Sequence, residues 1–150
     1  MVVDFLLKRA IKIPLESTTK PGVLIELVDL LCDVYELDRK EEILTAILER
    51  EELMSTGVGY GIAIPHAKID FITVSKLVGG VSPSGIDYDA VDGRLSQIFF
   101  LLVSPRNGSG DHVRILSSLS RTLHSQEVRD MVITAPSSEQ LIRILREYDK

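Results

Sequence analysis

Apolar residues recur at helical spacing near the start of the chain. The spacing predicts a helix from about Pro21 to Tyr35, and a proline suits the first turn of such a helix. A second helix is expected after Asp38, which together with Glu41 has the form of a capping box. The core face of this second helix would consist of four residues at helical spacing: Ile43, Leu44, Ile47 and Leu48.

The middle of the chain has short apolar runs instead, which predict strands. Ile62–Ile64 is expected to form a short buried strand that stops at Pro65 and His66. Lys76–Val81 and Gln97–Ser104 are two further strand candidates. The second is apolar at both odd and even positions, which is typical of a central strand covered on both faces. Residues 85–93 carry Gly, Asp and Tyr and suit a turn or hairpin connection between them.

The last third of the chain is predicted to be helical again. A helix is expected to begin near Asp111 or His112, and a short one to run from Ser125 through Met131. The first of these would have five residues along one face: Val113, Leu116, Leu119, Ser120 and Leu123.

Ser137 and Gln140 form another capping-box pattern, which would open a terminal helix. Its apolar positions are Leu141, Ile144 and Leu145. Helices at both ends around a small central sheet predict an α/β or α+β sandwich, and no domain boundary interrupts residues 1–150.

Composition and the N-terminal sequence indicate the cellular compartment in which the protein is expected. With 150 residues, of which 45% are hydrophobic, the chain is long enough for one sizeable core. The N-terminus has no signal-peptide pattern, and the longest apolar runs are too short to cross a bilayer. A single cysteine, Cys32, excludes a disulfide framework. We therefore expect a cytoplasmic protein with no direct membrane insertion.

Charge and spacing exclude several functions. The net charge is −5 and the basic residues are dispersed, so no nucleic-acid partner is expected. One cysteine and three dispersed histidines do not form a zinc site. The glycines at 57, 59 and 61 are not a nucleotide fingerprint, because they follow a helix and precede a strand. The segment around Ser84 lacks the leading glycine of a hydrolase nucleophile elbow.

His66 is the first candidate for chemistry. It follows an apolar strand and a proline, which would hold the imidazole rigidly while leaving it exposed. The upstream glycines can bring backbone N–H groups close to an anion. A neutral imidazole is a nucleophile near pH 7 and suits phosphoryl transfer. The alternative is a structural histidine at the end of a strand.

The other two histidines differ in their surroundings. His112 follows Gly110 and Asp111 and falls in the first turn of the predicted helix, where the helix dipole favours anions and disfavours protonation of a histidine. It can donate a hydrogen bond to a phosphate held by His66, or it is an exposed first-turn residue. His124 ends the same helix on another face and is interpreted as a surface residue.

The segment Ser55–Ala67, which contains Gly-Ile-Ala-Ile-Pro-His ending at His66, resembles the signature of a known family. This is the type-2 EIIA domain of the bacterial phosphotransferase system, the fructose, mannitol and nitrogen-regulatory group. The resemblance extends over nearly the whole chain. It implies a mixed sheet of about five strands flanked by helices.

The resemblance also implies roles for three residues. His66 would be phosphorylated on Nε2, and His112 would support the phosphate without being phosphorylated. Arg50 would lie over the same pocket and neutralise phosphate charge, a role that suits the forked N–H donors of its guanidinium. No cofactor and no metal is implied. Two departures from the family pattern are Tyr60, where asparagine is common, and Lys68, which either helps hold phosphate or is a solvated residue.

The implied partners follow from the same resemblance. The donor would be the phosphocarrier HPr or its nitrogen-branch counterpart. The acceptor would be a cysteine of an EIIB domain, in the service of sugar uptake. The alternative is a nitrogen-type regulator, whose phosphorylation state controls its binding to a target protein.

Overall fold

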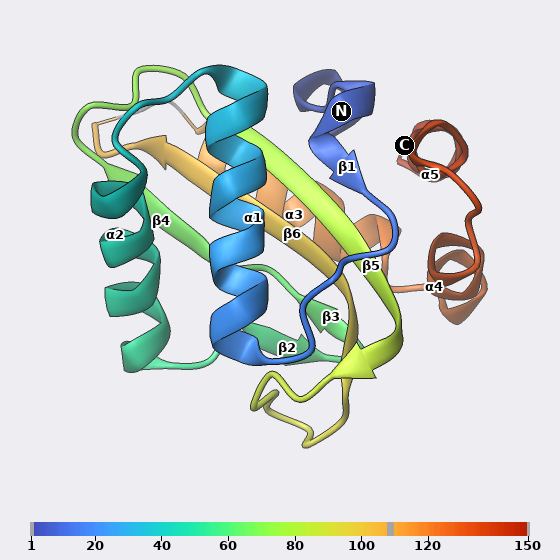
Figure 1. The fold of residues 1–150 in the computed structure, drawn as a ribbon. Coiled ribbons are helices and arrows are strands. Elements are labelled where there is room, and N and C mark those ends of the chain that lie inside the picture. The colour runs from blue at the N-terminus through green and yellow to red at the C-terminus, as the bar shows by residue number, and fades with distance from the viewer. Residues whose placement is uncertain (1, 108–109, 150) are drawn as a thin grey trace.

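The computed structural model describes residues 2–107 and 110–149 (Figure 1). Within these residues the helices are α1 (Lys20–Tyr35), α2 (Lys40–Leu53), α3 (Asp111–Thr122), α4 (Gln126–Ile133) and α5 (Ser138–Tyr148). The strands are β1 (Ile11–Lys12), β2 (Gly57–Gly59), β3 (Ile62–Ala63), β4 (His66–Ile69), β5 (Lys76–Ile86) and β6 (Ser96–Pro105). Two short 3-10 helices, Val2–Phe5 and Lys8–Ala10, precede β1.

All six described strands form one mixed sheet in the order β1-β5-β6-β3-β2, with β4 also paired to β6. β5 and β6 are antiparallel, whereas β1 is parallel to β5 and both β3 and β4 are parallel to β6. Helix α1 lies over one face of the sheet and α3 lies behind it (Figure 1). The predicted sandwich is confirmed, and the described sheet has six strands where about five were expected.

Strand β6 is the centre of the core. Its residues 98–103 are at most 1% exposed, which confirms the prediction of a strand covered on both faces. The expected strand at Lys76–Val81 is the first part of β5, and the predicted hairpin connection joins β5 to β6.

The first helix forms where the spacing predicts it, whereas two details of the second were wrong. The side chain of Thr19 caps α1 by accepting a hydrogen bond from the N–H of Gly22. Asp38 does not cap α2, because the helix begins at Lys40 and the cap position therefore falls on Arg39.

The expected core face of α2 also needs correction. Leu48 is 39% exposed and Leu44 is only partly buried. The buried stripe runs instead through Ile43, Ile47 and Glu51, one turn apart, so the third inward position is a carboxylate rather than an aliphatic residue.

The face assigned to α3 was right in part. Leu119 and Leu123 are fully buried and Leu116 packs against the core, but Val113 is 65% exposed and Ser120 is exposed. Ile115, Ser118 and Thr122 are buried in their place. The helix is rotated so that two small hydroxyl residues face inward. The predicted cap at Ser137 is confirmed, since Ser137 accepts from the N–H of Gln140. The short helix expected from Ser125 forms as α4, and Ser125 caps it by accepting from the N–H of Val128.

The strand before His66 does not end where it was expected to end. β3 stops at Ala63, and β4 begins at His66 itself. Both segments pair with β6 in one continuous register. Between them the N–H of Ile64 donates to the carbonyl of Thr56, and Pro65 has no N–H. His66 therefore starts a strand at the edge of the sheet rather than ending one.

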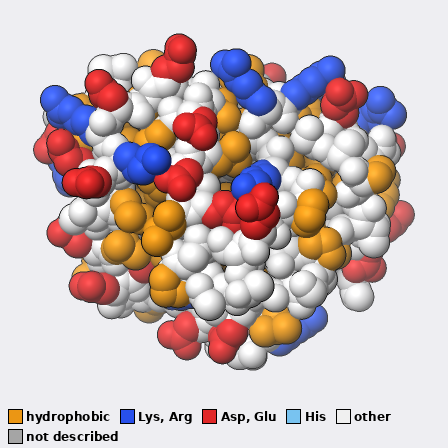
Figure 2. Space-filling model, viewed as in Figure 1, with side chains coloured by type: hydrophobic (Ala, Val, Ile, Leu, Met, Phe, Trp, Pro, Cys, Tyr) orange, Lys and Arg blue, Asp and Glu red, His pale blue; other side chains and the backbone are white. Residues whose placement is uncertain are grey.

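Charged side chains of both signs are interspersed over the face that carries α1 (Figure 2). This face therefore lacks the basic stripe that a nucleic-acid backbone requires. No helix in residues 2–107 and 110–149 combines the length and apolar character needed to cross a membrane.

Candidate functional site

A pocket of about 570 Å³ lies at the β4 edge of the sheet, between α2 and the start of α3. It is lined by residues of these elements and of the segment after β6: Ala46, Glu49, Arg50, Leu53, His66, Ala67, Lys68, Arg106 and His112. The three residues predicted from the sequence, His66, His112 and Arg50, thus meet in one pocket.

The protonation of the His66 ring follows from one hydrogen bond. Nδ1 of His66 lies 2.8 Å from the backbone oxygen of Ile64. A carbonyl oxygen only accepts, so the neutral ring carries its proton on Nδ1 and has its lone pair on Nε2. Burial lowers the pKa of His66, and the positive charge of Arg50 lowers it further, against the opposing effect of the Ile64 bond. The ring is therefore neutral near pH 7, with a nucleophilic Nε2.

His112 lies beside it, in the first turn of α3 as predicted. The two ring centroids are 5.4 Å apart and the planes meet at 67°. Nδ1 of His112 is 2.8 Å from the hydroxyl oxygen of Ser104 in β6. Burial lowers the pKa of His112 to about 4, helped by the proximity of His66 and Lys68.

We expect His112 to titrate near pH 4 rather than near its ordinary pKa of 6.5. Because the unfolded chain takes up this proton near pH 6.5, the free energy of unfolding should fall as the pH falls from 6.5 towards 4. An NMR titration of the histidine rings measures the midpoint, and Lys68→Met should raise it by removing a positive charge. A wild-type midpoint for His112 near 6.5 would contradict the geometry.

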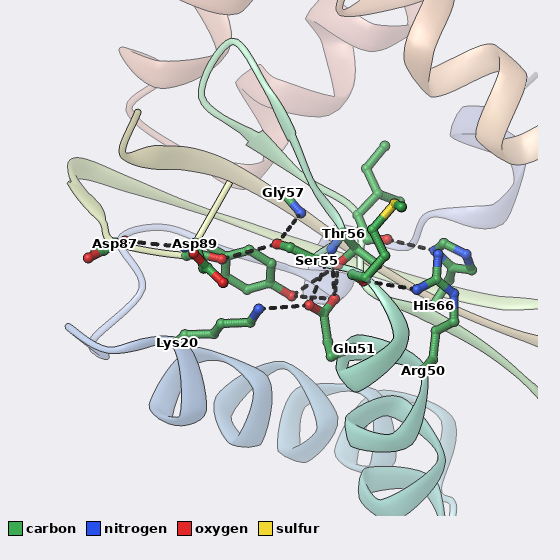
Figure 3. A network of polar contacts seen from close by, with 12 residues as sticks. Lys20, Arg50, Glu51, Ser55, Thr56, Gly57, His66, Asp87 and Asp89 are labelled. Atoms are coloured by element: carbon green, nitrogen blue, oxygen red, sulfur yellow. Dashed lines mark hydrogen bonds and ion pairs between the residues drawn. The ribbon is translucent and has the colours of Figure 1, made fainter. Parts of the chain in front are cut away.

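Arg50 comes from the last turn of α2, and its side chain lies beside that of His66 (Figure 3). Its Nη1 donates to the backbone oxygen of Met54 at 3.0 Å, which holds the guanidinium over the end of the helix. A guanidinium has five N–H donors, so this bond leaves others for an anion in the pocket.

Glu51, the neighbour of Arg50, anchors a network that sequence reasoning missed (Figure 3). The residue is only 8% exposed. Its carboxylate pairs with Lys20 at 2.9 Å and accepts from the hydroxyl of Tyr88 at 3.0 Å. It also accepts from both the N–H and the hydroxyl of Thr56. The network ties the end of α2 and the start of the glycine-rich segment to α1 and to the segment after β5.

The glycine-rich segment forms a tight hairpin between β2 and β3. Gly59 and Gly61 have φ values of 98° and 79°, which favour glycine. Tyr60 between them has a φ of 59°, a left-handed conformation in which asparagine is more often found. Its N–H donates to Asp92, and the guanidinium of Arg129 lies 5.1 Å from the centre of its ring.

Lys68 and Arg106 add positive charge at the rim of the pocket. Lys68 lies on the same face of β4 as His66, two residues along, and is exposed. Arg106 pairs with Asp70 at 2.6 Å and also donates to the backbone oxygen of Lys68.

His124 is exposed and lies outside the pocket, which confirms its interpretation as a surface residue. Cys32 is buried in α1. In the part of the chain that the structure describes, no group of three or more His, Cys, Asp or Glu side chains is arranged to hold a metal ion.

The fold and pocket together define a small α/β domain with a paired-histidine site. The model of the EIIA type-2 family of the phosphoenolpyruvate-dependent sugar phosphotransferase system matches residues 4–148. The chain therefore belongs to this family, which confirms the resemblance found in its sequence.

Individual relatives agree with the family. The chain is 40% identical over 129 residues to the fructose-specific EIIA component of Haloferax volcanii, covering 86% of this chain and 84% of that protein. It is 34% identical to the fructose-specific EIIABC component of Bacillus subtilis over 99% of this chain, but spans only 24% of that protein. The crystal structure of the nitrogen regulatory protein IIA-Ntr of Neisseria meningitidis superimposes with a TM-score of 0.89 at 27% identity, covering 96% of this chain and 98% of that one.

Proposed function

We propose that this protein carries phosphoryl groups on His66 between two protein partners. It accepts the group from phospho-HPr, or from the nitrogen-branch counterpart of HPr, and passes it to a cysteine of an EIIB domain in sugar uptake. The single observation that carries the proposal is the bond from His66 Nδ1–H to Ile64, which leaves Nε2 as the only nucleophilic nitrogen of the ring.

The transfer needs no proton movement at His66. The Nε2 lone pair forms the new N–P bond in line, and the electrons of the breaking bond return to the donor's nitrogen. The phosphorylated ring retains its Nδ1 proton and so becomes cationic, and the carbonyl of Ile64 stabilises it. In the onward step an EIIB thiolate attacks phosphorus, and the N–P electrons return to Nε2.

The residues around His66 supply charge and position. Arg50 neutralises phosphate charge, and the ring of His112 is close enough to donate to a phosphate oxygen. Positioning and charge neutralisation account for most of the catalysis in such transfers. The arrangement of Arg50, His112 and backbone donors requires neither a metal nor a cofactor.

The partner surface is expected around the pocket mouth. Leu53 is 81% exposed and Met54 is 66% exposed, both at the end of α2, and Val113 is 65% exposed on α3. Exposed apolar side chains beside a half-buried nucleophile suit a modest and transient interface.

Reconstitution tests the carrier function. Incubation with labelled phosphoenolpyruvate, enzyme I and HPr should place an acid-labile, base-stable phosphate on the protein, since phosphohistidine has that stability pattern. The same mixture with the nitrogen-branch carrier identifies the preferred donor. Absence of label with both carriers would show that the protein is not a phosphoryl carrier.

The alternative function is a nitrogen-type regulator, favoured by the close structural likeness to a nitrogen regulatory protein. Label that moves on to an EIIB domain, such as that of a fructose-specific EIIABC component, would support the transport function. A target protein bound only by the unphosphorylated form, with no transfer to any EIIB domain, would support regulation instead.

A further inference from the structure

Two buried serines form a hydrogen-bonded chain that ends at the ring of His112. Ser104, near the end of β6, is 1% exposed, and Ser75, just before β5, is 6% exposed. Their hydroxyl oxygens are 3.0 Å apart, and Ser104 is also the hydrogen-bond partner of His112 Nδ1. A buried hydroxyl is costly unless it is hydrogen-bonded, so the directions of these bonds are constrained.

The direction of the first bond follows from its geometry. The hydroxyl of Ser75 is oriented to donate to the oxygen of Ser104. Ser104 then has one proton left to place. Among the described residues its other hydrogen-bond partner is Nδ1 of His112, 2.8 Å away.

The second bond is settled by counting protons. If Nδ1 of His112 carried the proton, Ser104 would accept twice and its own buried hydroxyl proton would have no acceptor. If Ser104 donates to Nδ1, both buried hydroxyl protons have an acceptor. The neutral His112 ring then carries its proton on Nε2.

We propose that Ser75 and Ser104 form a hydrogen-bond relay that sets the tautomer and orientation of His112, so that its Nε2–H donates to the phosphoryl group on His66. This inference rests on the proposed phosphorylation of His66. The serines are positioning residues, because they touch neither the phosphoryl group nor the partner, and no proton moves along the relay during transfer.

The two histidines are thereby held in opposite tautomers by opposite kinds of partner. The carbonyl of Ile64 can only accept, which places the proton of His66 on Nδ1 and makes Nε2 a nucleophile. The hydroxyl of Ser104 donates, which makes Nε2 of His112 a donor. The low pKa of His112 keeps that ring neutral across the physiological range, so the tautomer is maintained.

A long-range ¹H–¹⁵N NMR spectrum of the wild-type protein near pH 7 tests the tautomers without any variant. We expect His66 to be protonated on Nδ1 and His112 on Nε2. In Ser104→Ala the Nδ1 resonance of His112 should move towards the position of a nitrogen that accepts no hydrogen bond. A wild-type spectrum in which Nδ1 of His112 carries the proton would overturn the relay.

Transfer kinetics test the consequence. The protein is labelled through HPr, purified and mixed with excess unphosphorylated HPr, and the return of label is followed. Ser104→Ala should slow this return about 10-fold, the worth of one well-placed hydrogen bond. In a His112→Ala background the same substitution should have no further effect, because a residue that acts only through His112 has nothing left to position.

Ser96 offers a matched control. It is buried in the same strand, and its hydroxyl has no hydrogen-bond partner in the described structure. Ser96→Ala should therefore return label at the wild-type rate. Equal slowing in both serine variants, or equal slowing by Ser104→Ala with and without His112, would overturn the relay, as would a Ser104→Ala rate equal to wild type. Failure of the proposed function is distinguishable, because the wild-type protein would then take no label at all.

Discussion

Replacing His66 with alanine is expected to lower phosphate incorporation from phospho-HPr by about 100-fold or more, because it removes the nucleophile itself. The measurement is radiolabel on the protein after incubation with phosphoenolpyruvate, enzyme I and HPr. No other described histidine combines a position in the pocket with an Nε2 lone pair: the proposed tautomer of His112 has its lone pair on Nδ1, held by Ser104.

The control for this prediction is His124→Ala. His124 is exposed and lies outside the pocket, so its loss should leave labelling unchanged. Full labelling of His66→Ala would show that the site has been assigned to the wrong residue. Loss of labelling in both variants would point to a general effect of removing a histidine rather than to a nucleophile.

The second large effect is expected at Glu51. Glu51→Ala should lower the free energy of unfolding by about 3 kcal/mol, because it leaves buried donors of Thr56 and Tyr88 without their carboxylate acceptor and Lys20 without its partner. Tyr88 is fully buried, so water cannot replace the lost acceptor without a structural change. Urea unfolding followed by circular dichroism measures the change.

Glu52 provides the matched comparison for Glu51. It is the next residue of the same helix and has an exposed side chain. Glu52→Ala should change stability by no more than about 0.5 kcal/mol. If the two substitutions had equal effects, the carboxylate network would not be what holds the glycine-rich segment and the end of α2 in place.

Much of the fold was predictable because helix α1, strand β6 and the caps at Ser125 and Ser137 are governed by local pattern. The errors arose where tertiary packing decides. A buried glutamate extends the inward stripe of α2, and α3 turns two hydroxyl residues inward. Neither choice is visible in apolar spacing, because the residues that define the face are polar.

The site was predictable in part for a similar reason. His66, His112 and Arg50 are far apart in the sequence. The residues around His66 and His112 already linked these two histidines in one hypothesis, whereas Arg50 was added only by the family resemblance. The structure places them in one pocket. In the sequence Ser104 is only the polar residue that ends an apolar run. Its proposed positioning of His112 depends on Ser75, which lies just before the neighbouring strand β5, and no local pattern specifies that contact.

The most direct test of the central claim is to locate the phosphorus on the phosphorylated protein. Long-range ¹H–¹⁵N NMR of the ¹⁵N-labelled protein, recorded before and after phosphorylation through HPr, identifies the ring nitrogen that is modified. We predict phosphorus on Nε2 of His66, with Nδ1 of the same ring still protonated and both nitrogens of His112 unmodified. Phosphorus on Nδ1 of His66, on His112, or on a residue outside the pocket would contradict the proposed function.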